Sequence, residues 1–550
     1  MTRAQDEAVA TQEVLPTTPT DDRWPPQIKY IVGNEACERF SFYGMRSILA
    51  TFITGAVVTG GLGQPADTST SIIHTFIFAV YFMPLFGAWL SDKIVGRYHT
   101  ILWVSLFYCA GHGVLACSDL VHTVSGKLTI LYTGLGLIAF GSGGIKPCVS
   151  AFMGDQFKAN QGHLLQKAYA AFYWSINFGS FFSFLVIPWV RDSWGYSWAF
   201  GVPGILMALA TIIFVAGTKY YVRVPPNRKT KSAGFLKVFF GAYAAQPSFS
   251  FTPLINILGS VVLPLLAMVA LTFVALRDNL TPGVQLVGKI GLGCVVLWYL
   301  LIVVSTLLGK ADLKESFWAA ARNRFTESEI SAASSVAPIL FVFALIPVFW
   351  SLFDQTTSTW VLQGTRMIPA HVFGLKIGAE QMQSANPALV MVLVPVLTLV
   401  VYKRLGRFAS PLRRMSLGMF LAAASYVVVA ALQTRIEAGA QLSVLWQVLP
   451  YMVLTTAEVL VSTTGLEFAF REAAPQMKSI IMSFWLLTVA FGNLLVTGIT
   501  KIFTGAGAHA ESVTASRFLT FAGLTFVVAI LFSLIAWRYQ YRDKAAALGR

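Results

Sequence analysis

Apolar runs of about 20 residues recur along nearly the whole 550-residue chain, and they constrain its fold more than any other feature. One α-helix of that length crosses roughly 30 Å of hydrocarbon, and a spanning helix satisfies its own backbone polar groups. Only 12% of the residues are charged, against roughly 25% in a soluble domain. The sequence therefore predicts an all-α membrane protein with no separate soluble domain.

The apolar windows predict twelve transmembrane helices in two six-helix bundles, with an inserted two-helix hairpin between them. The expected spans lie near residues 28–55, 71–95, 98–119, 126–153, 166–190 and 196–217, then 253–276 and 287–308 for the hairpin, then 332–360, 382–402, 411–434, 441–469, 477–504 and 516–538. We expect five parts, namely a disordered cytosolic tail (1–27), an N-terminal bundle (28–220), a linker with two extra transmembrane helices (221–330), a C-terminal bundle (331–540) and a second cytosolic tail (541–550).

The distribution of basic residues predicts the orientation in the membrane. Residues 402–414, YKRLGRFASPLRR, hold five Lys or Arg side chains, whereas residues 56–70 hold none. Both termini should therefore lie in the cytoplasm, and we expect a multi-pass protein of the cell inner membrane. Basic loops also account for the formal charge of +15, so no nucleic-acid partner is expected.

The stretch NEACERFSFYGMRS, residues 34–47, places four ions inside the first span. At about 100° per residue, Glu35, Glu38, Arg39 and Arg46 share one helix face. Each ion at bilayer depth costs about 2.5–3.5 kcal/mol, so this face should meet a bundle interior or an aqueous cavity. There Arg39 can pair with the carboxylate at i−4. A purely structural ion pair at the helix end is the alternative.

This charged stripe is also a candidate proton switch. Burial disfavours an ionised carboxylate, and a neighbouring arginine favours it. Movement of Arg39 would therefore change whether Glu35 or Glu38 holds a proton.

Further ions lie in other spans. Lys146 follows the small residues GSGG, which let helices approach closely, and it precedes Pro147, which frees backbone groups. Asp354 and Glu458 lie in two spans of the second half. Such ions mark functional sites by default. The alternative for each is a lone snorkelling or capped residue, which weighs more for Glu467 near the cytosolic end.

Neutral polar groups are less specific. His74 is either a hydrogen-bonded core histidine or a proton relay, and packing is the default role of Tyr81 and Asn177. The five cysteines lack paired metal-ligand spacing, so we expect buried thiols, no metal and no cofactor. The chain contains no G-x-S-x-G or H-E-x-x-H motif, and an enzyme is not expected.

Two sets of motifs resemble known families. GAWLSDKIVGRYHT, residues 87–100, resembles the G-x-x-x-D-[RK]-x-x-G-R loop of the major facilitator superfamily. In chain order, EACERF followed by YG, GGIKP to DQF, FYWSINFGS, AEVLVSTTGLEFAF and MKSIIMSFWLLTVAFGN resemble signatures of the proton-dependent oligopeptide transporter (POT/PTR) family. The chain thus resembles a prokaryotic di-/tripeptide symporter with the major facilitator fold.

The resemblance implies roles for single residues. It implies proton coupling through Glu35, Glu38, Arg39, Lys146, Asp354 and His74. It implies substrate binding by Arg39, Tyr43, Arg46, Tyr81, Lys146, Asn177, Glu458 and Trp485, with the basic residues at the peptide carboxylate and Glu458 at its amino terminus. In two departures, Phe42 stands where many members have a second tyrosine, and Asp354 where several bacterial members have Glu.

These observations predict a proton-coupled symporter that imports di- and tripeptides by alternating access. Protonation of Glu35 or Glu38 would free Arg39 and Lys146 for the peptide carboxylate. The expected partners are the peptide, protons and the lipid bilayer, and we expect a monomer. The alternatives are a proton-coupled transporter of nitrate or another organic anion, and a peptide sensor that does not transport. An acidic Glu458 opposite basic residues favours a zwitterion over an anion.

Overall fold

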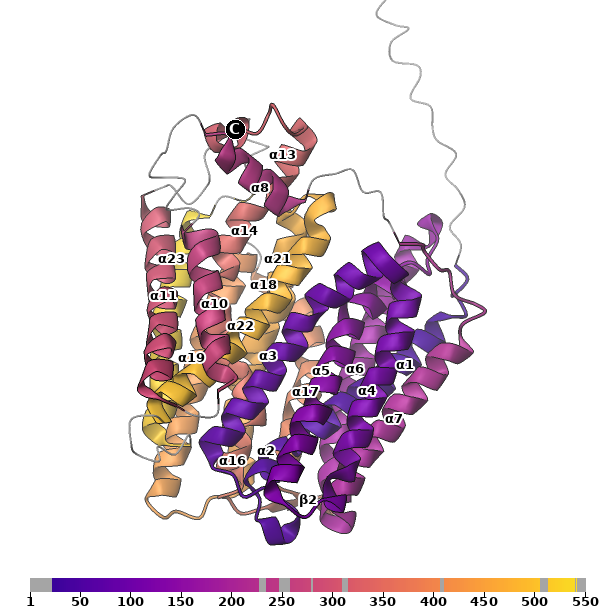
Figure 1. The fold of residues 1–550 in the computed structure, drawn as a ribbon, viewed down its shortest axis with the longest axis vertical. Coiled ribbons are helices and arrows are strands. Elements are labelled where there is room, and N and C mark those ends of the chain that lie inside the picture. The colour runs from indigo at the N-terminus through magenta and orange to yellow at the C-terminus, as the bar shows by residue number, and fades with distance from the viewer. Residues whose placement is uncertain are drawn as a thin grey trace, which may run out of the picture.

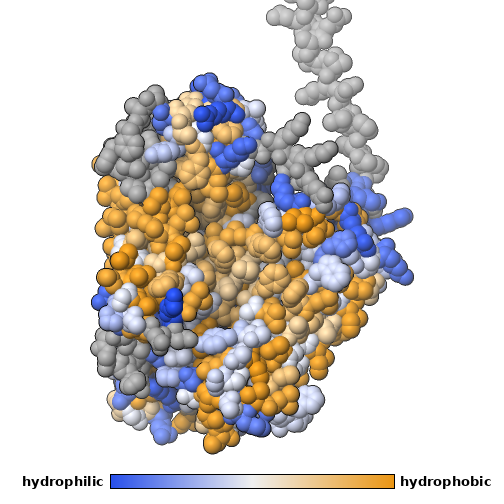
Figure 2. Space-filling model, viewed as in Figure 1, coloured by the Kyte–Doolittle hydropathy of each residue, from blue (hydrophilic) through white to orange (hydrophobic). Residues whose placement is uncertain are grey.

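The computed structural model describes residues 22–226, 234–246, 258–277, 280–308, 315–405, 410–504, 513–539 and 541. They form a helical bundle with one short antiparallel hairpin, β1 (Ala370–Val372) and β2 (Leu375–Ile377). Apolar side chains cover the middle of the visible face, and hydrophilic ones gather towards its upper and lower rims (Figure 2). The all-α membrane fold expected from the apolar runs is confirmed.

The N-terminal half consists of α1 (Ile28–Ser47), α2 (Leu49–Thr54), α3 (Ala66–Leu90), α4 (Arg97–Ala116), α5 (Val124–Gly154), α6 (Gly162–Trp194) and α7 (Tyr196–Ala216). Glycines let these helices approach closely. A Cβ on Gly179 of α6 would lie 2.5 Å from the carbonyl oxygen of Ala36 in α1. A Cβ on Gly87 of α3 would lie 2.7 Å from the backbone of Gly144 in α5. The close approach predicted from the GSGG run is therefore confirmed.

The linker forms α8 (Phe235–Ala244), α10 (Leu263–Ala275), α11 (Pro282–Leu307) and α12 (Glu315–Ala319). The α10–α11 hairpin packs on the outer side of the C-terminal half, against α22 (Lys478–Thr504) (Figure 1). Lys501 of α22 fixes one end of it by donating hydrogen bonds of 3.3, 2.9 and 2.6 Å to the carbonyls of Val274, Ala275 and Arg277. Residues 253–257 of the predicted window 253–276 lie outside the described residues.

The C-terminal half consists of α13 (Glu327–Ser334), α14 (Val336–Phe343), α15 (Pro347–Phe353), α16 (Thr359–Gly364), α17 (Ala385–Val396), α18 (Tyr402–Leu405), α19 (Pro411–Glu437), α20 (Val448–Glu458), α21 (Thr464–Glu472), α22 and α23 (Ala515–Arg538). The window 332–360, predicted as one span, is instead broken, with a 45° bend between Phe343 and Pro347. Proline lacks a backbone N–H, so Pro347 begins a helix more readily than it continues one.

Eleven helices in the described part of the chain are long and apolar enough to cross a membrane, or twelve if the bent pair counts as one span. Helix α1 is outside this count because its stripe of Glu and Arg side chains makes it too charged. Helix α10 is outside it because only 13 residues form its regular helix. With these two added, the described part of every window predicted from the sequence corresponds to a helix or, for 332–360, to the bent pair.

Polar side chains of the two halves contact each other at one end of the molecule. We call it the hairpin end, after the β-hairpin of β1 and β2, which is distinct from the inserted α10–α11 hairpin. Helices α2 and α16 lie there too. The opposite end carries α8 and α13, and we call it the α8 end (Figure 1). Helix α1 begins and α23 ends towards the α8 end. Hydrogen bonds of Arg46, His74 and Arg191 join the two halves towards the hairpin end.

Candidate functional site

The charged stripe of α1 is buried and internally paired. The Arg39 Nε lies 2.6 Å from Glu35 Oε1 and 3.0 Å from Glu38 Oε2, and none of the three residues is more than 8% exposed. The pairing of Arg39 with the carboxylate at i−4 is therefore confirmed. When both carboxylates are ionised, one guanidinium leaves this trio with a net negative charge.

Lys146 of α5 projects its ammonium over two aromatic rings. Its Nζ lies 4.2 Å from the ring centroid of Tyr81 on α3 and 4.5 Å from that of Phe42 on α1. It makes neither a hydrogen bond nor an ion pair with any described residue. Glu38 and Asp354 lie within electrostatic range of it. The sequence marked Lys146 as an ion at membrane depth, and the structure gives that ammonium no direct partner among the described residues.

A chain of polar contacts links the two halves beyond Lys146. Arg46 of α1 pairs with Asp354, Nη2 to Oδ1 at 2.8 Å, and its Nε donates to Thr357 Oγ1 at 3.2 Å. Asn493 of α22 donates from Nδ2 to the other oxygen of Asp354 at 2.7 Å. Arg46 is thus bound across the interface between the halves.

His74 of α3 completes this chain. Because Asn493 uses its Nδ2 for Asp354, its Oδ1 is left to accept from His74 Nδ1 at 2.7 Å. A neutral His74 therefore carries its proton on Nδ1, and its Nε2 accepts from the hydroxyl of Ser358 at 2.8 Å. Both ring nitrogens of this fully buried histidine are satisfied by groups of the other half.

Glu458 is a second acidic residue of the C-terminal half, within electrostatic range of Asp354; we call the ions Glu35, Glu38, Arg39, Arg46, Lys146, Asp354 and Glu458 the ion cluster. It is the last residue of α20, directly before a π-helical turn, Val459–Thr463; such turns are frequent at functional sites. Asn386 of α17 donates from Nδ2 to Glu458 Oε2 at 2.6 Å. Tyr43 lies within electrostatic range of both Glu458 and Arg39. Acidic and basic groups of opposite halves thus share the surroundings of one tyrosine.

In the part of the chain that the structure describes, no hydrogen bond, ion pair or ring contact joins Asn177 or Trp485, two of the residues implied in substrate binding, to the charged groups. Asn177 donates from Nδ2 to the backbone oxygen of Tyr173 in its own helix at 2.9 Å. Trp485 packs edge-on against Phe343 and Trp350, with ring centroids at 5.1 and 6.2 Å. The described contacts bring neither side chain into the ion cluster.

A second connection between the halves escaped the sequence reading. Glu380, which precedes α17, pairs with Arg191 of α6 and accepts a hydrogen bond from Thr51 of α2. Lys376 of β2 lies 3.4 Å from Asp192. Asn386 and Asn493 were missed in the same way, although an amide inside an apolar stretch such as FGNLLV is a usable signal.

The α8 end holds the loop that resembles the major facilitator motif. Arg97 donates from Nη1 to both carboxylate oxygens of Asp155 at 2.7 Å, and Asp92 lies 3.5 Å away. Gly96 supplies the left-handed turn, with φ +84°. Glu467 pairs with Arg414 at 2.9 Å and is half exposed, which fits the capped, structural alternative for that residue.

Comparisons with known proteins agree on one family. Residues 98–515 match the model of the POT family. Solute carrier family 15 member 2 of Rattus norvegicus is 31% identical over 452 residues, which cover 78% of this chain and 53% of that protein. Peptide transporter family 1 of Drosophila melanogaster is 32% identical over 427 residues, 76% and 49% of the two chains. The chain spans about half the length of the curated relatives it matches.

Solved structures are similar over almost the full chain. The POT family transporter PepTSo is 40% identical with a TM-score of 0.79, covering 94% of this chain and 99% of the other. An auto-inhibited POT family peptide transporter is 38% identical with a TM-score of 0.78, covering 94% and 98%. The expected major facilitator architecture is confirmed by these neighbours. Because the family model matches more than half of the residues and both kinds of relative agree with it, this chain belongs to the POT family of transporters.

Proposed function

We propose that the protein is a proton-coupled symporter that imports di- and tripeptides by alternating access. Support comes from the family and from the relatives named as peptide transporters. The expected partners remain the peptide, protons and the bilayer, and we propose that the chain acts as a monomer and not as an enzyme.

The main support for the proposal is the ammonium of Lys146, which has no hydrogen bond or ion pair with any residue that the structure describes. A charge at this depth needs an opposite charge, and aromatic faces replace it only in part. The carboxylate of a peptide supplies that charge on the N-terminal half, while Glu458 on the other half receives the amino group. An extended peptide advances about 3.3–3.6 Å per residue, so a pair of opposed charges favours short zwitterions.

Proton coupling follows from the trio of Arg39, Glu35 and Glu38. Protonation of either carboxylate removes one of the two negative charges that hold Arg39. Arg39 then becomes free to join Lys146 at the peptide carboxylate, so that a proton and a peptide enter together. We assign Tyr43, Tyr81, Asn177 and Trp485 to the walls of the peptide site.

The gate is assigned to the hairpin end. Arg46, Asp354 and His74 bridge the halves there, and we propose that protonation of Asp354 loosens this bridge. With both termini in the cytoplasm, the hairpin end faces the outside of the inner membrane, so the described conformation is closed to the outside. Rocking of the halves then alternates access.

Uptake of labelled dialanine into proteoliposomes with an alkaline interior tests the proposal. The parent chain should accumulate dialanine above its external concentration, and Lys146→Gln and Glu35→Gln should not. Full accumulation by either variant would refute the coupling scheme. Uptake of nitrate without competition by dialanine would favour the anion transporter, and saturable dialanine binding without uptake would favour the sensor.

A further inference from the structure

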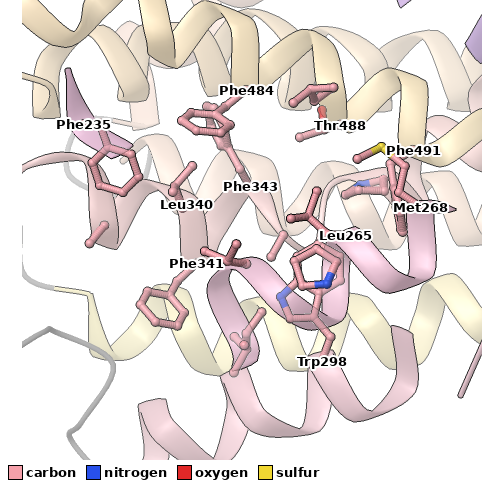
Figure 3. A pocket seen from close by; sticks show the side chains of 18 of the residues that line it. Phe235, Leu265, Met268, Trp298, Leu340, Phe341, Phe343, Phe484, Thr488 and Phe491 are labelled. Carbon is pink, nitrogen blue, oxygen red and sulfur yellow. The ribbon is translucent and has the colours of Figure 1, made fainter. Parts of the chain in front are cut away.

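An apolar cavity lies between the inserted α10–α11 hairpin and the C-terminal half, beside the region where the hairpin packs against α22. Its volume is about 370 Å³, and its walls come from α8, α10, α11, α14 and α22. Figure 3 shows Trp298 of α11, Met268 of α10, Phe341 of α14 and Phe491 of α22 directed towards the same space. The cavity therefore has walls from both the linker and the C-terminal half.

The walls offer water almost nothing to bind. Among the lining side chains, Thr488 and Trp298 carry hydrogen-bonding groups and the others are aromatic or aliphatic. The hydroxyl of Thr488 already donates to the backbone oxygen of Trp485 at 2.7 Å, which leaves a single indole N–H as a free donor among the described lining residues. A buried water needs two to four polar partners, and apolar cavities stay dry. An empty cavity is also unfavourable, because its lining atoms lose dispersion contacts in proportion to its volume. A hydrocarbon occupant removes both problems.

The cavity is open to a source of hydrocarbon. Helices α11 and α22 are among the candidate spans, so these walls lie at bilayer depth. At the rim, Leu236 and Phe240 of α8 and Leu265 of α10 are 48%, 45% and 49% exposed. An acyl chain of a neighbouring lipid can therefore enter sideways between α8 and α10, leaving its headgroup at the level of α8.

We propose that this cavity is a binding site for one acyl chain of a bilayer phospholipid, taken from the leaflet at the α8 end. The site is separate from the ion cluster, and the inference does not depend on the transported substrate. It gives the inserted hairpin a role, since α10 and α11 build the outer wall. Leu340, Phe343 and Pro347 place the bound chain beside the bend between α14 and α15.

Quenching by phospholipids brominated in the acyl chain tests this site in proteoliposomes. The signal of Trp298 is the fluorescence difference between the parent and Trp298→Phe. The same subtraction with Trp103→Phe and Trp360→Phe gives two reference signals. Trp103 is 59% exposed and represents full contact with lipid, and Trp360 is fully buried and represents none. Trp298 is expected to be quenched more than Trp360. Quenching no stronger than that of Trp360 would overturn the proposal.

Two cavity variants separate the bound chain from ordinary bilayer contact. Ala337→Leu adds atoms to the cavity and should lower the quenching of Trp298, whereas Leu265→Ala enlarges the cavity and should raise it. Neither should change the quenching of Trp103. Thermal unfolding and gel filtration check that each variant is folded, and Leu265→Ala alone suffices if Ala337→Leu is not. Quenching of Trp298 that does not respond to either folded variant would overturn the proposal.

Discussion

Lys146 is a buried ion whose ammonium has no hydrogen bond or ion pair among the described residues. A cation over an aromatic face gains about 0.5–1 kcal/mol at exposed sites and about 2 kcal/mol or more when desolvated. Removing an ion from water costs several kcal/mol even after relaxation. The rings of Tyr81 and Phe42 therefore hold the ammonium in place without compensating fully for its burial, and an anion that reaches Lys146 is bound strongly.

Lys146→Gln should weaken dialanine binding by about 10- to 100-fold, because one charge-assisted hydrogen bond contributes about 1.5–3 kcal/mol and 1.4 kcal/mol is tenfold. Competition against labelled dialanine in exchange uptake, without a proton gradient, measures the change. Lys127→Gln is the matched control, since Lys127 lies on the same helix but donates to the carbonyl of Gly60 at 2.9 Å. Equal affinity of Lys146→Gln and the parent would contradict the assignment.

Glu458 should determine recognition of the amino group. The parent should bind dialanine more tightly than N-acetyl-dialanine, and Glu458→Gln should lose most of this preference, because the amide no longer offers a charge to the ammonium. The binding affinities of both ligands, measured for parent and variant, form a double-mutant cycle that gives the coupling energy between the Glu458 carboxylate and the peptide amino group. Glu467→Gln, at the α8 end, should keep the preference. A preference unchanged in Glu458→Gln would place the amino group elsewhere.

At the scale of elements, the contact between α3 and α5 depends on glycine. A Cβ on Gly87 would meet the backbone of Gly144, which cannot rotate away. Gly87→Ala should therefore lower the Tm in detergent. Gly113→Ala is the control on α4, because no atom lies within 4 Å of the added Cβ, and it should be neutral or stabilising by up to about 1 kcal/mol. A Tm of Gly87→Ala at or above that of Gly113→Ala would show that these helices separate freely.

The contact of Glu380 with Arg191 and Thr51 should hold the hairpin end closed. Glu380→Gln removes the charge that attracts Arg191, so the open state should become more populated. Spin labels at Val58→Cys and Phe373→Cys report this, since both positions are fully accessible, one on each half. In a background without the five native cysteines, the distance distribution should gain a longer component. An unchanged distribution would mean that other contacts alone close this end.

Local geometry explains which contacts could be predicted. Glu35 and Arg39 are one helical turn apart, so the pair follows from the sequence once the helix is assumed. The GSGG run gives the close approach of α3 to α5 for a similar reason. The bend before Pro347 was missed because a proline inside a span often only kinks it, and its surroundings decide between a kink and a break.

At the scale of the whole molecule, the contacts between the halves could not be predicted. Arg46 and Asp354 are 308 positions apart, and His74 and Asn493 are 419 apart. The tilt of the two bundles determines which of their faces meet. The predicted transmembrane segments do not contain this information. The sequence thus identified most of the ions but neither the bridge that Arg46 makes nor the contact of Glu380 with Arg191.

In the proposed mechanism, ions from both halves meet in one site where peptide and proton entry are coupled. The most direct test of this mechanism is proton movement driven by peptide alone. Proteoliposomes containing a trapped pH dye receive external dialanine at equal pH, with potassium and valinomycin to dissipate charge. The lumen should acidify with the parent chain and stay neutral with Glu35→Gln and Lys146→Gln. Dialanine entry without acidification by the parent would contradict this mechanism.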